Sequence, residues 1–444
     1  MATFKVTPVL LEHVDLESSW TLDTYLSKGG YEGIKKAIEM APDALIDFVK
    51  NSGLRGRGGA GFSTGMKWSF VPKKTDKPKY LVLNADESEP GTFKDRKVIE
   101  RWPHSIIEGA LVACWAVGIK TCYIYIRGEM PLGYKRLVGA CKEAYARGFL
   151  GKNLFGKPGF DVDLTIHRGA GAYICGEETG LLSSLEGGRG YPKLKPPFPA
   201  ISGLFGCPTV VNNVVTVAYL PYILARGLDW WKSFGTAKST GLIPFSVSGH
   251  VKKPGIYEMG LGVPLKELIM EHAGGWDRPL KAIIPGGSSS KVLKLPDDWD
   301  VAMDFDSLGA KGSMLGSAAV IAIDDSVCMV DALLNLLRFY HHESCGQCTP
   351  CREGSGWAEK ILRRLESGYG RPEDPQMLLD IADRAIGKTI CVMAEAFGWP
   401  IQSYVAKFRA EFDRHVAERK CPFNPHAQPA PRGLPMAVTP APVH

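Results

Sequence analysis

The sequence predicts an α/β protein in which a parallel-sheet domain is followed by a small α+β domain and a C-terminal helical bundle. Three observations support this fold class. Strand-like and helix-like segments alternate over residues 80–187, short strands surround one helix between residues 241 and 326, and helical apolar spacing dominates residues 327–420. A chain of 444 residues is also long enough for several domains.

The first domain, residues 1–240, shows the pattern of βαβ crossovers. Strands are expected at 80–85, 121–129 and 161–167, each followed by a helix, at 103–118, 133–150 and 176–187. Such alternation predicts a parallel, Rossmann-like sheet whose ligands bind at the carboxyl ends of the strands. A helix at 42–53 precedes these segments. A loop rich in Pro and Gly at 190–209, followed by a helix at 212–227, completes the domain.

The second domain, residues 241–326, is expected to be β-grasp-like. It contains a hairpin at 245–258, a helix at 264–275, and short strands at 281–290 and 318–324.

Residues 327–420 predict a bundle of four helices, at 328–343, 352–368, 377–387 and 400–420. The remaining 421–444 segment is strewn with proline, which predicts a tail that is disordered alone or wraps a partner in extended form.

Composition excludes several classes of function. The net charge of +6 is modest and spread along the chain, so nucleic-acid binding is not expected. The longest apolar stretch, 106–119, contains Glu108 and is shorter than the roughly 20 residues that span a bilayer, so direct membrane insertion is not expected. The first residues lack the features of a secretory signal. We therefore expect a cytoplasmic protein, at most docked on a membrane complex.

A cysteine motif gives the strongest chemical signal. Cys345, Cys348 and Cys351 form a C-x-x-C-x-x-C run, and Cys391 follows two helices later. Three thiolates on one loop and a distant fourth favour a [4Fe–4S] cluster. Zinc remains an alternative, although its four-cysteine sites favour two separated pairs. Cys421 could replace one of these four cysteines as a ligand. The other six cysteines are expected to be buried apolar side chains; they are Cys114, Cys122, Cys141, Cys175, Cys207 and Cys328.

A glycine-rich loop, GRGGAG at Gly56–Gly61, is a candidate phosphate site. Closely spaced glycines let backbone N–H groups converge on an anion, and Arg57 and Lys67 add positive charge. The loop follows a predicted helix rather than a strand, so an ordinary dinucleotide fingerprint is doubtful. A flexible loop without a ligand is the alternative.

Two further motifs place polar groups near strand ends. NADESEPGTFKDR begins at Asn84, where the first strand ends, and crowds acidic and polar side chains at a ligand-binding edge. GAYICGEETG carries Gly176 for close approach of a flat ring, with Glu177 and Glu178 at a helix N-terminus. A solvated acidic turn and compensation of the helix dipole are the respective alternatives.

These motifs, with LRGRGGAGFSTGMKW and PTVVNNVVT, occur in one chain in a fixed order. Over residues 20–420 the sequence resembles the NADH-binding flavoprotein subunit (the F subunit) of respiratory NADH:quinone oxidoreductase, complex I. The resemblance implies FMN, a [4Fe–4S] cluster and NADH as substrate. It departs at Ser63, where proline is usual, and in VMAEAFGWP after Cys391, where a small polar run is commoner.

The resemblance also implies roles for individual residues. Positions bordering the FMN and NADH phosphates are Gly56, Arg57, Gly58, Gly59, Ala60, Gly61, Phe62, Gly65 and Lys67. Flavin-contacting positions are Asn84, Asp86, Glu87, Ser88, Gly176, Glu177, Asn212 and Asn213. Phe62, Phe70 and Phe198 match the aromatics that hold the adenine. Glu89, Tyr173 and Glu178 match residues near the nicotinamide and ribose, and Glu178 is expected to repel the 2′-phosphate of NADPH. Cys345, Cys348, Cys351 and Cys391 match the cluster ligands.

The implied partners are a thioredoxin-like [2Fe–2S] subunit and a large multi-cluster subunit, at the periphery of the inner membrane. A diaphorase subunit of an NAD-linked hydrogenase or formate dehydrogenase is an alternative within the same chemistry. A zinc-stabilised scaffold that binds partners is an alternative of another class, and it predicts a colourless protein.

Overall fold

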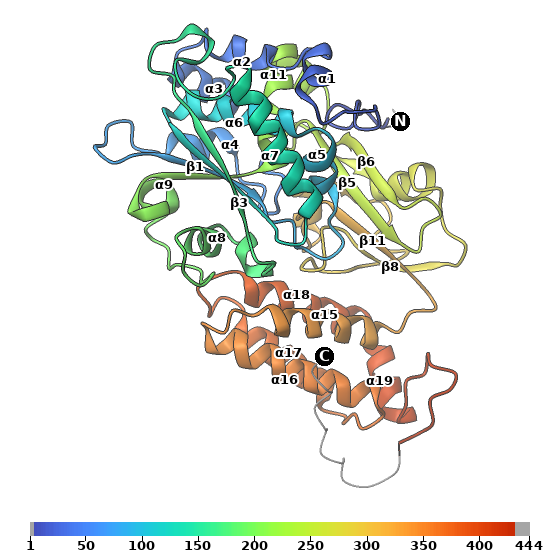
Figure 1. The fold of residues 1–444 in the computed structure, drawn as a ribbon. Coiled ribbons are helices and arrows are strands. Elements are labelled where there is room, and N and C mark those ends of the chain that lie inside the picture. The colour runs from blue at the N-terminus through green and yellow to red at the C-terminus, as the bar shows by residue number, and fades with distance from the viewer. Residues whose placement is uncertain (1–3, 431–444) are drawn as a thin grey trace. The chain divides into compact units, whose positions relative to one another are not determined.

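The structure is a computed structural model that describes residues 4–430. The chain divides into two compact units, the first ending at Ile323 and the second beginning at Asp324. Figure 1 shows helices and strands mixed in the first unit and helices in the second. Helices and strands therefore follow the predicted α/β fold class.

The first sheet is parallel, with the strand order β3-β2-β1-β4. It consists of β1 (Tyr80–Ala85), β2 (Thr121–Ile126), β3 (Asp163–Arg168) and β4 (Thr209–Asn213). Strand β1 is central, pairing with β2 from Tyr80 opposite Thr121 and with β4 from Tyr80 opposite Thr209. Apolar side chains on both faces explain why β1 reads as a continuous hydrophobic run.

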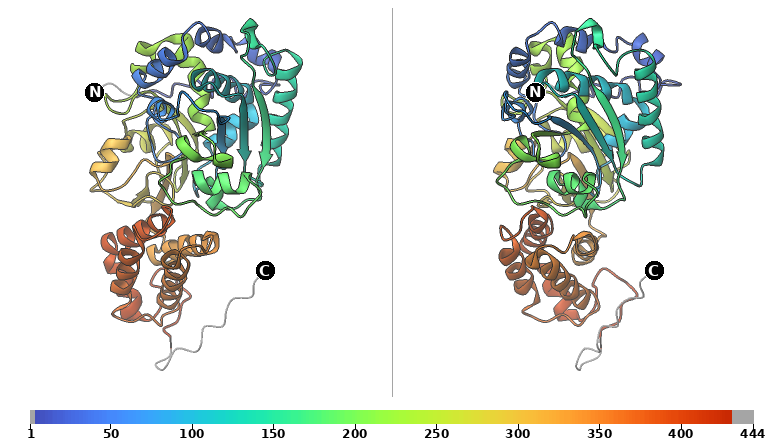
Figure 2. Two further views of the ribbon diagram at one scale, coloured as in Figure 1. Left: turned by 90° about the vertical axis from the view of Figure 1, so that its left-hand side faces the viewer. Right: turned by 60° about the vertical axis from the view of Figure 1, so that its left-hand side comes forward.

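The two longest helices of this unit lie between the first three strands. Helix α6 (Pro103–Val117) packs on β1 and β2, and α7 (Pro131–Ala146) packs on β3 and on α6. Nearly every residue of α6 is buried, and the helix ends at Gly118, whose φ of 72° is the left-handed conformation common after helices. Figure 2 shows helices on both sides of the sheet.

The remaining helices of this region are short. They are α1 (Leu22–Ser27), α2 (Glu32–Ala37), α3 (Pro42–Asn51), α4 (Thr64–Ser69), α5 (Lys94–Arg101), α8 (Glu178–Leu185), α9 (Pro199–Ser202), α10 (Val214–Ala218), α11 (Leu220–Arg226) and α12 (Leu228–Lys232), with 3-10 turns η1 (Leu154–Gly156), η2 (Tyr173–Gly176) and η3 (Leu204–Gly206).

The prediction of one long helix at 212–227 is wrong at its start. Residues Thr209–Asn213 form β4 beside β1, and the helical part is divided at Tyr219 into α10 and α11. The β-branched run TVV favours a strand in the buried position next to β1. The break between α10 and α11 is explained by Pro221, which has no N–H with which to continue the preceding helix.

The second sheet is mixed, with the order β6-β5-β11-β8-β9. Its hairpin joins β5 (Leu242–Gly249) to β6 (Gly255–Gly260), and β11 (Ala319–Asp324) runs parallel to β5. The other elements are β8 (Leu280–Ile284), β9 (Leu293–Lys294), the ladder of β7 (Val263–Pro264) with β10 (Ala302–Met303), α14 (Phe305–Ala310), and α13 (Leu265–Glu267) continuing into the π-helix η4 (Leu268–His272). A separate core that includes Phe245, Val263 and Leu308 supports this β-grasp-like α+β part.

The second unit is helical, as predicted, but its described residues form five helices rather than four. They are α15 (Met329–Glu343), α16 (Thr349–Glu366), α17 (Asp374–Ala385), α18 (Met393–Lys407) and α19 (Arg409–Glu418). The helix expected at 400–420 begins earlier, because Pro400 is accommodated inside α18, and it breaks at Phe408, which has non-helical backbone angles.

Residues 431–444, which hold most of the predicted tail, lie outside the described residues. None of the helices within residues 4–430 combines the length and apolar character that a membrane crossing requires.

Candidate functional site

The order in which strands are added to the parallel sheet reverses at β1. Strands β2 and β3 extend it on one side of β1, whereas β4, the last to follow in the chain, lies on the other. Open α/β sheets bind ligands at the carboxyl ends of the strands beside such a switch point. Asn84 and Asp86 lie at this end of β1, and Asn212 and Asn213 lie at the same end of β4. The topology thus brings together two motifs separated by more than 100 residues.

Hydrogen bonds join further segments to this edge. Asn84 donates from Nδ2 to the carbonyl of Gly176 at 2.8 Å. A Cβ at Gly176 would lie 3.4 Å from the carbonyl oxygen of Asp86, an ordinary van der Waals contact, so η2 packs directly on the end of β1. On the β4 side, Trp68 of α4 donates from Nε1 to Asn212 Oδ1 at 2.9 Å. The ends of β1 and β4 therefore meet η2 and α4.

The glycine loop also packs on the end of β4. It closes on itself through Gly56 N–H, which donates to Phe62 O at 2.8 Å. A Cβ at Gly58 would lie 2.9 Å from Asn213 Cβ, whereas Gly59, with a φ of 140°, has open space around it. Ser63, the position that departs from the family's proline, begins α4 by accepting from Met66 N–H at 3.4 Å. A helix cap therefore replaces the rigid ring at this turn.

Arg57 does not face the solvent side of this loop. Its guanidinium is fully buried, with Nε donating to Leu242 O at 3.1 Å and an Nη group donating to Thr240 O at 3.0 Å. Its N–H donates to Thr216 Oγ1 at 2.8 Å. Burial lowers the pKa of Arg57 to about 10. The structure thus gives its side chain a role in attaching the loop to the segment that enters β5, rather than offering positive charge at the surface.

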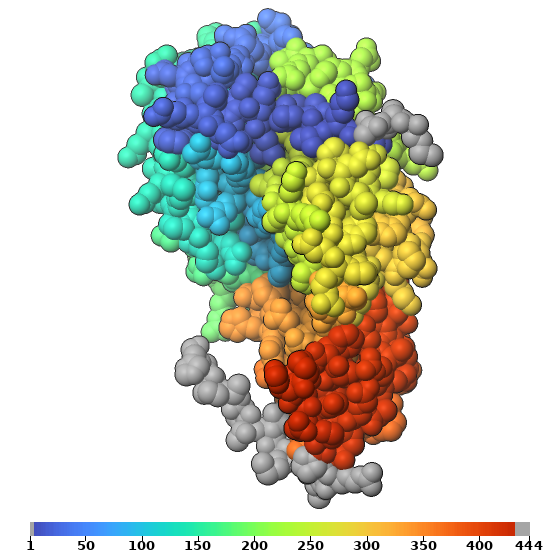
Figure 3. Space-filling view, turned by 90° about the vertical axis from the view of Figure 1, so that its right-hand side faces the viewer, coloured from blue at the N-terminus to red at the C-terminus, as the bar shows by residue number. Residues whose placement is uncertain are grey.

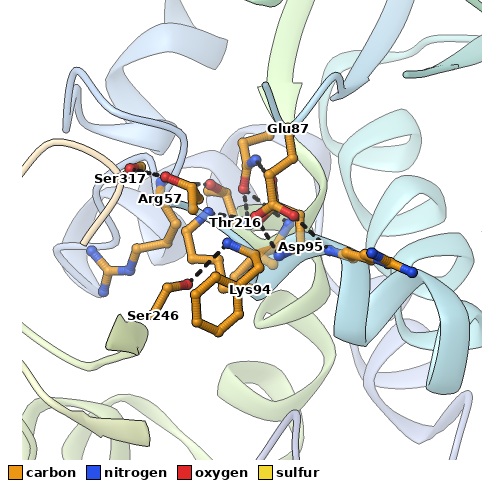
Figure 4. Close-up of polar contacts among 12 residues, drawn as sticks. Arg57, Glu87, Lys94, Asp95, Thr216, Ser246 and Ser317 are labelled. Carbon is orange, nitrogen blue, oxygen red and sulfur yellow. Dashed lines mark hydrogen bonds and ion pairs between the residues drawn. The ribbon is translucent and has the colours of Figure 1, made fainter. Parts of the chain in front are cut away.

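A buried acidic cluster lies behind the end of β1 (Figure 4). Glu87 accepts from the N–H groups of Asp95 at 2.7 Å and Arg96 at 2.9 Å, which are at the N-terminus of α5. Asp95 in turn accepts from Lys94 Nζ and from Asn213 Nδ2, both at 2.6 Å. Burial, and next the charge of Asp95, raise the pKa of Glu87 to about 7. Lys94 and Asp95 belong to the NADESEPGTFKDR motif, but its pattern did not distinguish them from surface residues.

Two hydroxyls in the segments that border the site are left for a ligand. Thr64 Oγ1 and Ser88 Oγ are buried, and neither has a hydrogen-bond partner within the described residues. A buried hydroxyl without a partner costs about 1–3 kcal/mol, so such groups call for a ligand or water. With the open backbone at Gly59, these orphaned groups fit a polar cofactor such as FMN.

Charged side chains from three segments meet at the start of α8. Glu178 lies 2.7 Å from Lys195 Nζ and 3.6 Å from Lys67 Nζ. Glu177 begins the helix by accepting from Thr179 N–H and Gly180 N–H, and it also pairs with Lys195 at 3.0 Å. Lys195 comes from the proline-rich loop, in which sequence reasoning singled out Phe198 but not this lysine.

Glu89 and Tyr173 are brought together. The Tyr173 hydroxyl donates to Glu89 Oε2 at 2.7 Å, and Glu89 Oε1 accepts from Ser289 N–H at 2.7 Å and from the Ser288 hydroxyl at 3.2 Å. The serines follow β8, so this contact joins the β-grasp-like part to the edge of the parallel sheet. Sequence reasoning missed both serines because they lie in a different predicted domain.

The three predicted adenine-binding aromatics are exposed. Phe62, Phe70 and Phe198 show 49%, 50% and 59% of their surface to solvent. The rings of Phe62 and Phe70 lie 6.2 Å apart, whereas Phe198 is on the loop that enters α9. All three rings are therefore accessible to a ligand.

The predicted cysteine ligands converge in the second unit. Cys345 lies between α15 and α16, Cys348 and Cys351 begin α16, and Cys391 lies two residues before α18. Ile390 N–H donates to Cys348 Sγ at 3.4 Å, which places the Cys391 segment against the motif. All eleven cysteines of the chain lie within the described residues and are thiols. A set of four thiols from two loops fits an iron–sulfur cluster.

Family models match most of the chain. The Nuo51 FMN-binding domain matches residues 49–222, an SLBB domain matches 244–321, and the NADH-ubiquinone oxidoreductase-F iron–sulfur binding region matches 331–415.

Curated relatives and a solved structure are similar to this chain over most of its length. The chain is 51% identical to the F 2 subunit of NADH-quinone oxidoreductase of Rhizobium meliloti (strain 1021), over 94% of this chain and 99% of that protein. It is 52% identical to the F subunit of NADH-quinone oxidoreductase of Streptomyces coelicolor, over 94% and 93%. A crystal structure of NAD+-reducing [NiFe]-hydrogenase in the air-oxidized state is similar, with a TM-score of 0.80, 32% identity, and coverage of 92% of this chain and 67% of that chain.

Proposed function

The chain belongs to the family of the NADH-quinone oxidoreductase F subunit, and from this premise we propose that it is the NADH dehydrogenase flavoprotein subunit of a respiratory complex I. The chemistry supplied by its bound groups is hydride acceptance from NADH by FMN, with onward transfer of single electrons through a [4Fe–4S] cluster. The protein's own task is to hold, orient and shield these groups.

The observation that carries the proposal is the meeting of three segments at the switch point of the sheet. The glycine loop packs through Gly58 on Asn213, and Asn84 binds the backbone of Gly176. Thr64 and Ser88 add buried hydroxyls without partners. A flat polar cofactor with a phosphate matches this combination of close backbone approach and orphaned donors.

We assign the remaining predicted residues around this centre. Asp86, Glu87, Glu177 and Asn212 border the flavin, and Gly56 to Gly65 with Lys67 border the phosphates. Arg57 anchors the loop from the interior. Glu89, Tyr173 and Glu178 position the nicotinamide and ribose, and Phe62, Phe70 and Phe198 hold the adenine. No side chain has to act as a nucleophile, because the reaction needs only the two rings held in register.

The cysteine site serves as the exit for electrons in this proposal. Cys345, Cys348, Cys351 and Cys391 hold the cluster, and three of the four are partly exposed, which suits transfer to another protein. The proposed recipients are a thioredoxin-like [2Fe–2S] subunit and a large multi-cluster subunit, in a complex peripheral to the inner membrane. Identity to the quinone-linked relatives over nearly their whole length supports this assembly.

A second candidate is the diaphorase module of an NAD-linked hydrogenase. The TM-score of 0.80 to the NAD+-reducing hydrogenase supports it. Identity is 32% there against 51% to the Rhizobium meliloti relative, and this difference favours the quinone-linked complex.

The proposal is tested by purifying the full chain anaerobically and recording its visible spectrum before and after one equivalent of NADH. We expect flavin absorption that bleaches on mixing, together with broad iron–sulfur absorption that Cys348→Ala removes. Cys207→Ala, a buried cysteine far from the motif in sequence, is the matched control and should leave both signals unchanged. A colourless protein that stays colourless after reconstitution with FMN, iron and sulfide would disprove the redox function.

Isolation of the chain from its native membranes then separates the two candidates. Co-purification with quinone-reducing activity supports complex I, whereas co-purification with hydrogenase activity supports the second candidate.

A further inference from the structure

The helical unit contains a second group of metal-ligating side chains, formed by Cys328, Glu366, His415 and Cys421. One ligand atom from each lies within 4.8 Å of all the others. Cys328 precedes α15, Glu366 ends α16, His415 is on α19, and Cys421 follows α19. Cys328, His415 and Cys421 are 7%, 0% and 4% exposed. Four segments of the chain thus direct donor atoms into one buried point.

Three of the six distances between the donor atoms are close to the edges of a coordination tetrahedron. Cys328 Sγ lies 3.3 Å from His415 Nε2 and 3.5 Å from Glu366 Oε2, and His415 Nε2 lies 3.1 Å from Glu366 Oε2. With bonds of about 2.3 Å to sulfur and about 2.0 Å to nitrogen or oxygen, tetrahedral zinc requires edges of about 3.5 Å between sulfur and nitrogen or oxygen and about 3.3 Å between nitrogen and oxygen. These three donors therefore accommodate a central ion with shifts of a few tenths of an ångström, and Cys421 Sγ lies within 4.8 Å of each of them.

The surrounding hydrogen bonds orient two of the ligands. His415 Nδ1 lies 2.7 Å from the carbonyl oxygen of Glu411, which can only accept, so Nδ1 carries the proton. Nε2 is then the ring nitrogen that faces Glu366 and Cys328, where it can serve as a metal ligand. Cys328 Sγ accepts from Asp331 N–H at 3.3 Å at the N-terminus of α15, and this contact fixes the position of the sulfur atom.

We propose that Cys328, Glu366, His415 and Cys421 bind one structural zinc ion. Two sulfurs, one imidazole nitrogen and one carboxylate oxygen form a ligand set that suits tetrahedral zinc, and four protein ligands leave no open position for a substrate. Cys328 is buried, as expected from the sequence, but it has polar partners rather than apolar surroundings alone. Cys421, expected as a possible substitute for an iron–sulfur ligand, belongs to this second group instead.

The site is separate from the iron–sulfur site. Helices α15 and α16 pack against each other as a hairpin whose connecting loop carries Cys345 and Cys348. Cys328 and Glu366 lie at the opposite, open end, and each helix is about 20 Å long or more at 1.5 Å per residue. Cys328 and Cys421 also fall outside the matched iron–sulfur region, 331–415. The iron–sulfur site thus lies at one end of the hairpin and the proposed zinc site at the other. The zinc ion would bind α19 and the segment after it to the open end.

The test measures zinc and iron in the full chain, purified anaerobically with its cluster, by mass spectrometry. We expect about one zinc and about four irons per chain. His415→Ala should lower zinc at least fivefold and leave iron unchanged, whereas Cys348→Ala should remove iron and leave zinc. His342→Ala, an exposed histidine on α15, is the matched control and should change neither.

Cobalt exchange covers the case in which His415→Ala fails to fold. Cobalt(II) in the wild-type chain should give the intense visible bands of a tetrahedral thiolate site, and Cys421→Ser should weaken and shift them. Wild-type protein that holds four irons but binds no zinc when incubated with one equivalent overturns the proposal. A zinc content that falls in Cys348→Ala but not in His415→Ala overturns the proposal too. Neither measurement uses NADH or FMN, so the result is independent of the proposed function.

Discussion

Glu178 keeps its negative charge in a partly buried position because two lysines face it. Burial by itself would raise the pKa of Glu178, but Lys67 and Lys195 outweigh burial and hold the pKa below its ordinary value. The carboxylate contributes stability above the unfolded-state pKa near 4.5, and this contribution is lost as the pH falls through the lowered folded-state value. At neutral pH Glu178 is therefore ionised.

The charge of Glu178 predicts the choice between NADH and NADPH. In the proposed role, Glu178→Gln removes a charge that would repel a 2′-phosphate. It also leaves Lys67 without its anionic partner and Lys195 paired only with Glu177, so both changes favour NADPH. We expect the ratio of kcat/KM for NADPH over NADH to rise about tenfold, equivalent to about 1.4 kcal/mol. Steady-state reduction of ferricyanide with each nucleotide gives this ratio.

Glu186→Gln is the matched control for Glu178→Gln. Glu186 follows the same helix and pairs with Lys193 at 2.6 Å, so its replacement removes an equal charge and a similar ion pair. An unchanged nucleotide ratio in Glu178→Gln, or an equal rise in Glu186→Gln, would contradict the role given to Glu178.

At the scale of elements, the start of α5 depends on a carboxyl group eight residues earlier in the chain. Glu87 satisfies the N–H groups of Asp95 and Arg96, while Asp95 reaches Asn213 at the end of β4. This network fixes the turn after β1 against β4. Because the network is buried, its contribution to the free energy of unfolding depends on pH, whereas the contribution of an exposed helix cap would change little.

The raised pKa of Glu87 sets the sign of that dependence. With a folded-state pKa of about 7 and an ordinary value of 4.5, the folded protein binds the proton more tightly. The contribution of Glu87 to stability is full below pH 4.5 and is lost as the pH rises through about 7. Relative to Glu87→Gln, the wild-type chain should lose up to about 1.4 kcal/mol of unfolding free energy per pH unit in that window.

Urea unfolding of wild type and Glu87→Gln at several pH values between about 4.5 and 8 measures this loss. The difference between the two proteins is the relevant quantity, because it cancels every other titrating group. A difference that stays constant with pH would show that Glu87 is ionised throughout.

For the first unit as a whole, a buried carboxylate joins segments that are far apart in sequence. Glu258 on β6 is fully buried and accepts from the N–H groups of Val9, Leu10 and Leu11 at 2.8, 3.1 and 3.0 Å, and from the Tyr219 hydroxyl at 2.7 Å. In Figure 3 the N-terminal residues, in blue, lie against the yellow surface of the β-grasp-like part. One side chain therefore holds the N-terminal segment and the helical layer onto the second sheet.

Replacing Glu258 should destabilise the whole first unit. Glu258→Gln keeps the shape but offers one accepting oxygen in place of two and turns an NH2 group toward backbone donors. We expect a loss of about 2–4 kcal/mol of unfolding free energy, measured by urea denaturation. Glu271→Gln, an exposed carboxylate on η4 of the same β-grasp-like part, should change it by less than about 0.5 kcal/mol. Equal effects of the two variants would contradict the role of Glu258.

The sequence by itself determined the fold class, most of the elements and the cysteine motif of this protein. Apolar periodicity is local, so strands such as Tyr80–Ala85 and helices such as Pro103–Val117 could be predicted from their own residues. The motif at Cys345 is equally local, since its spacing follows from the size of a cluster. Strand β4 could not be predicted with the same method, because its five residues become a strand only through the slot beside β1.

Tertiary structure decided which side chains share a site. Arg57 and Lys67 are both cations near the glycine loop, but contacts with Thr240 and Leu242 bury the first, while the second pairs with Glu178. Lys195 and Ser289 carry no local signal, because their partners lie 17 and 200 residues away. Cys328, Glu366 and His415 of the proposed zinc site are likewise 38 to 87 residues apart. The direction and burial of a side chain depend on packing between distant segments, which no local pattern encodes.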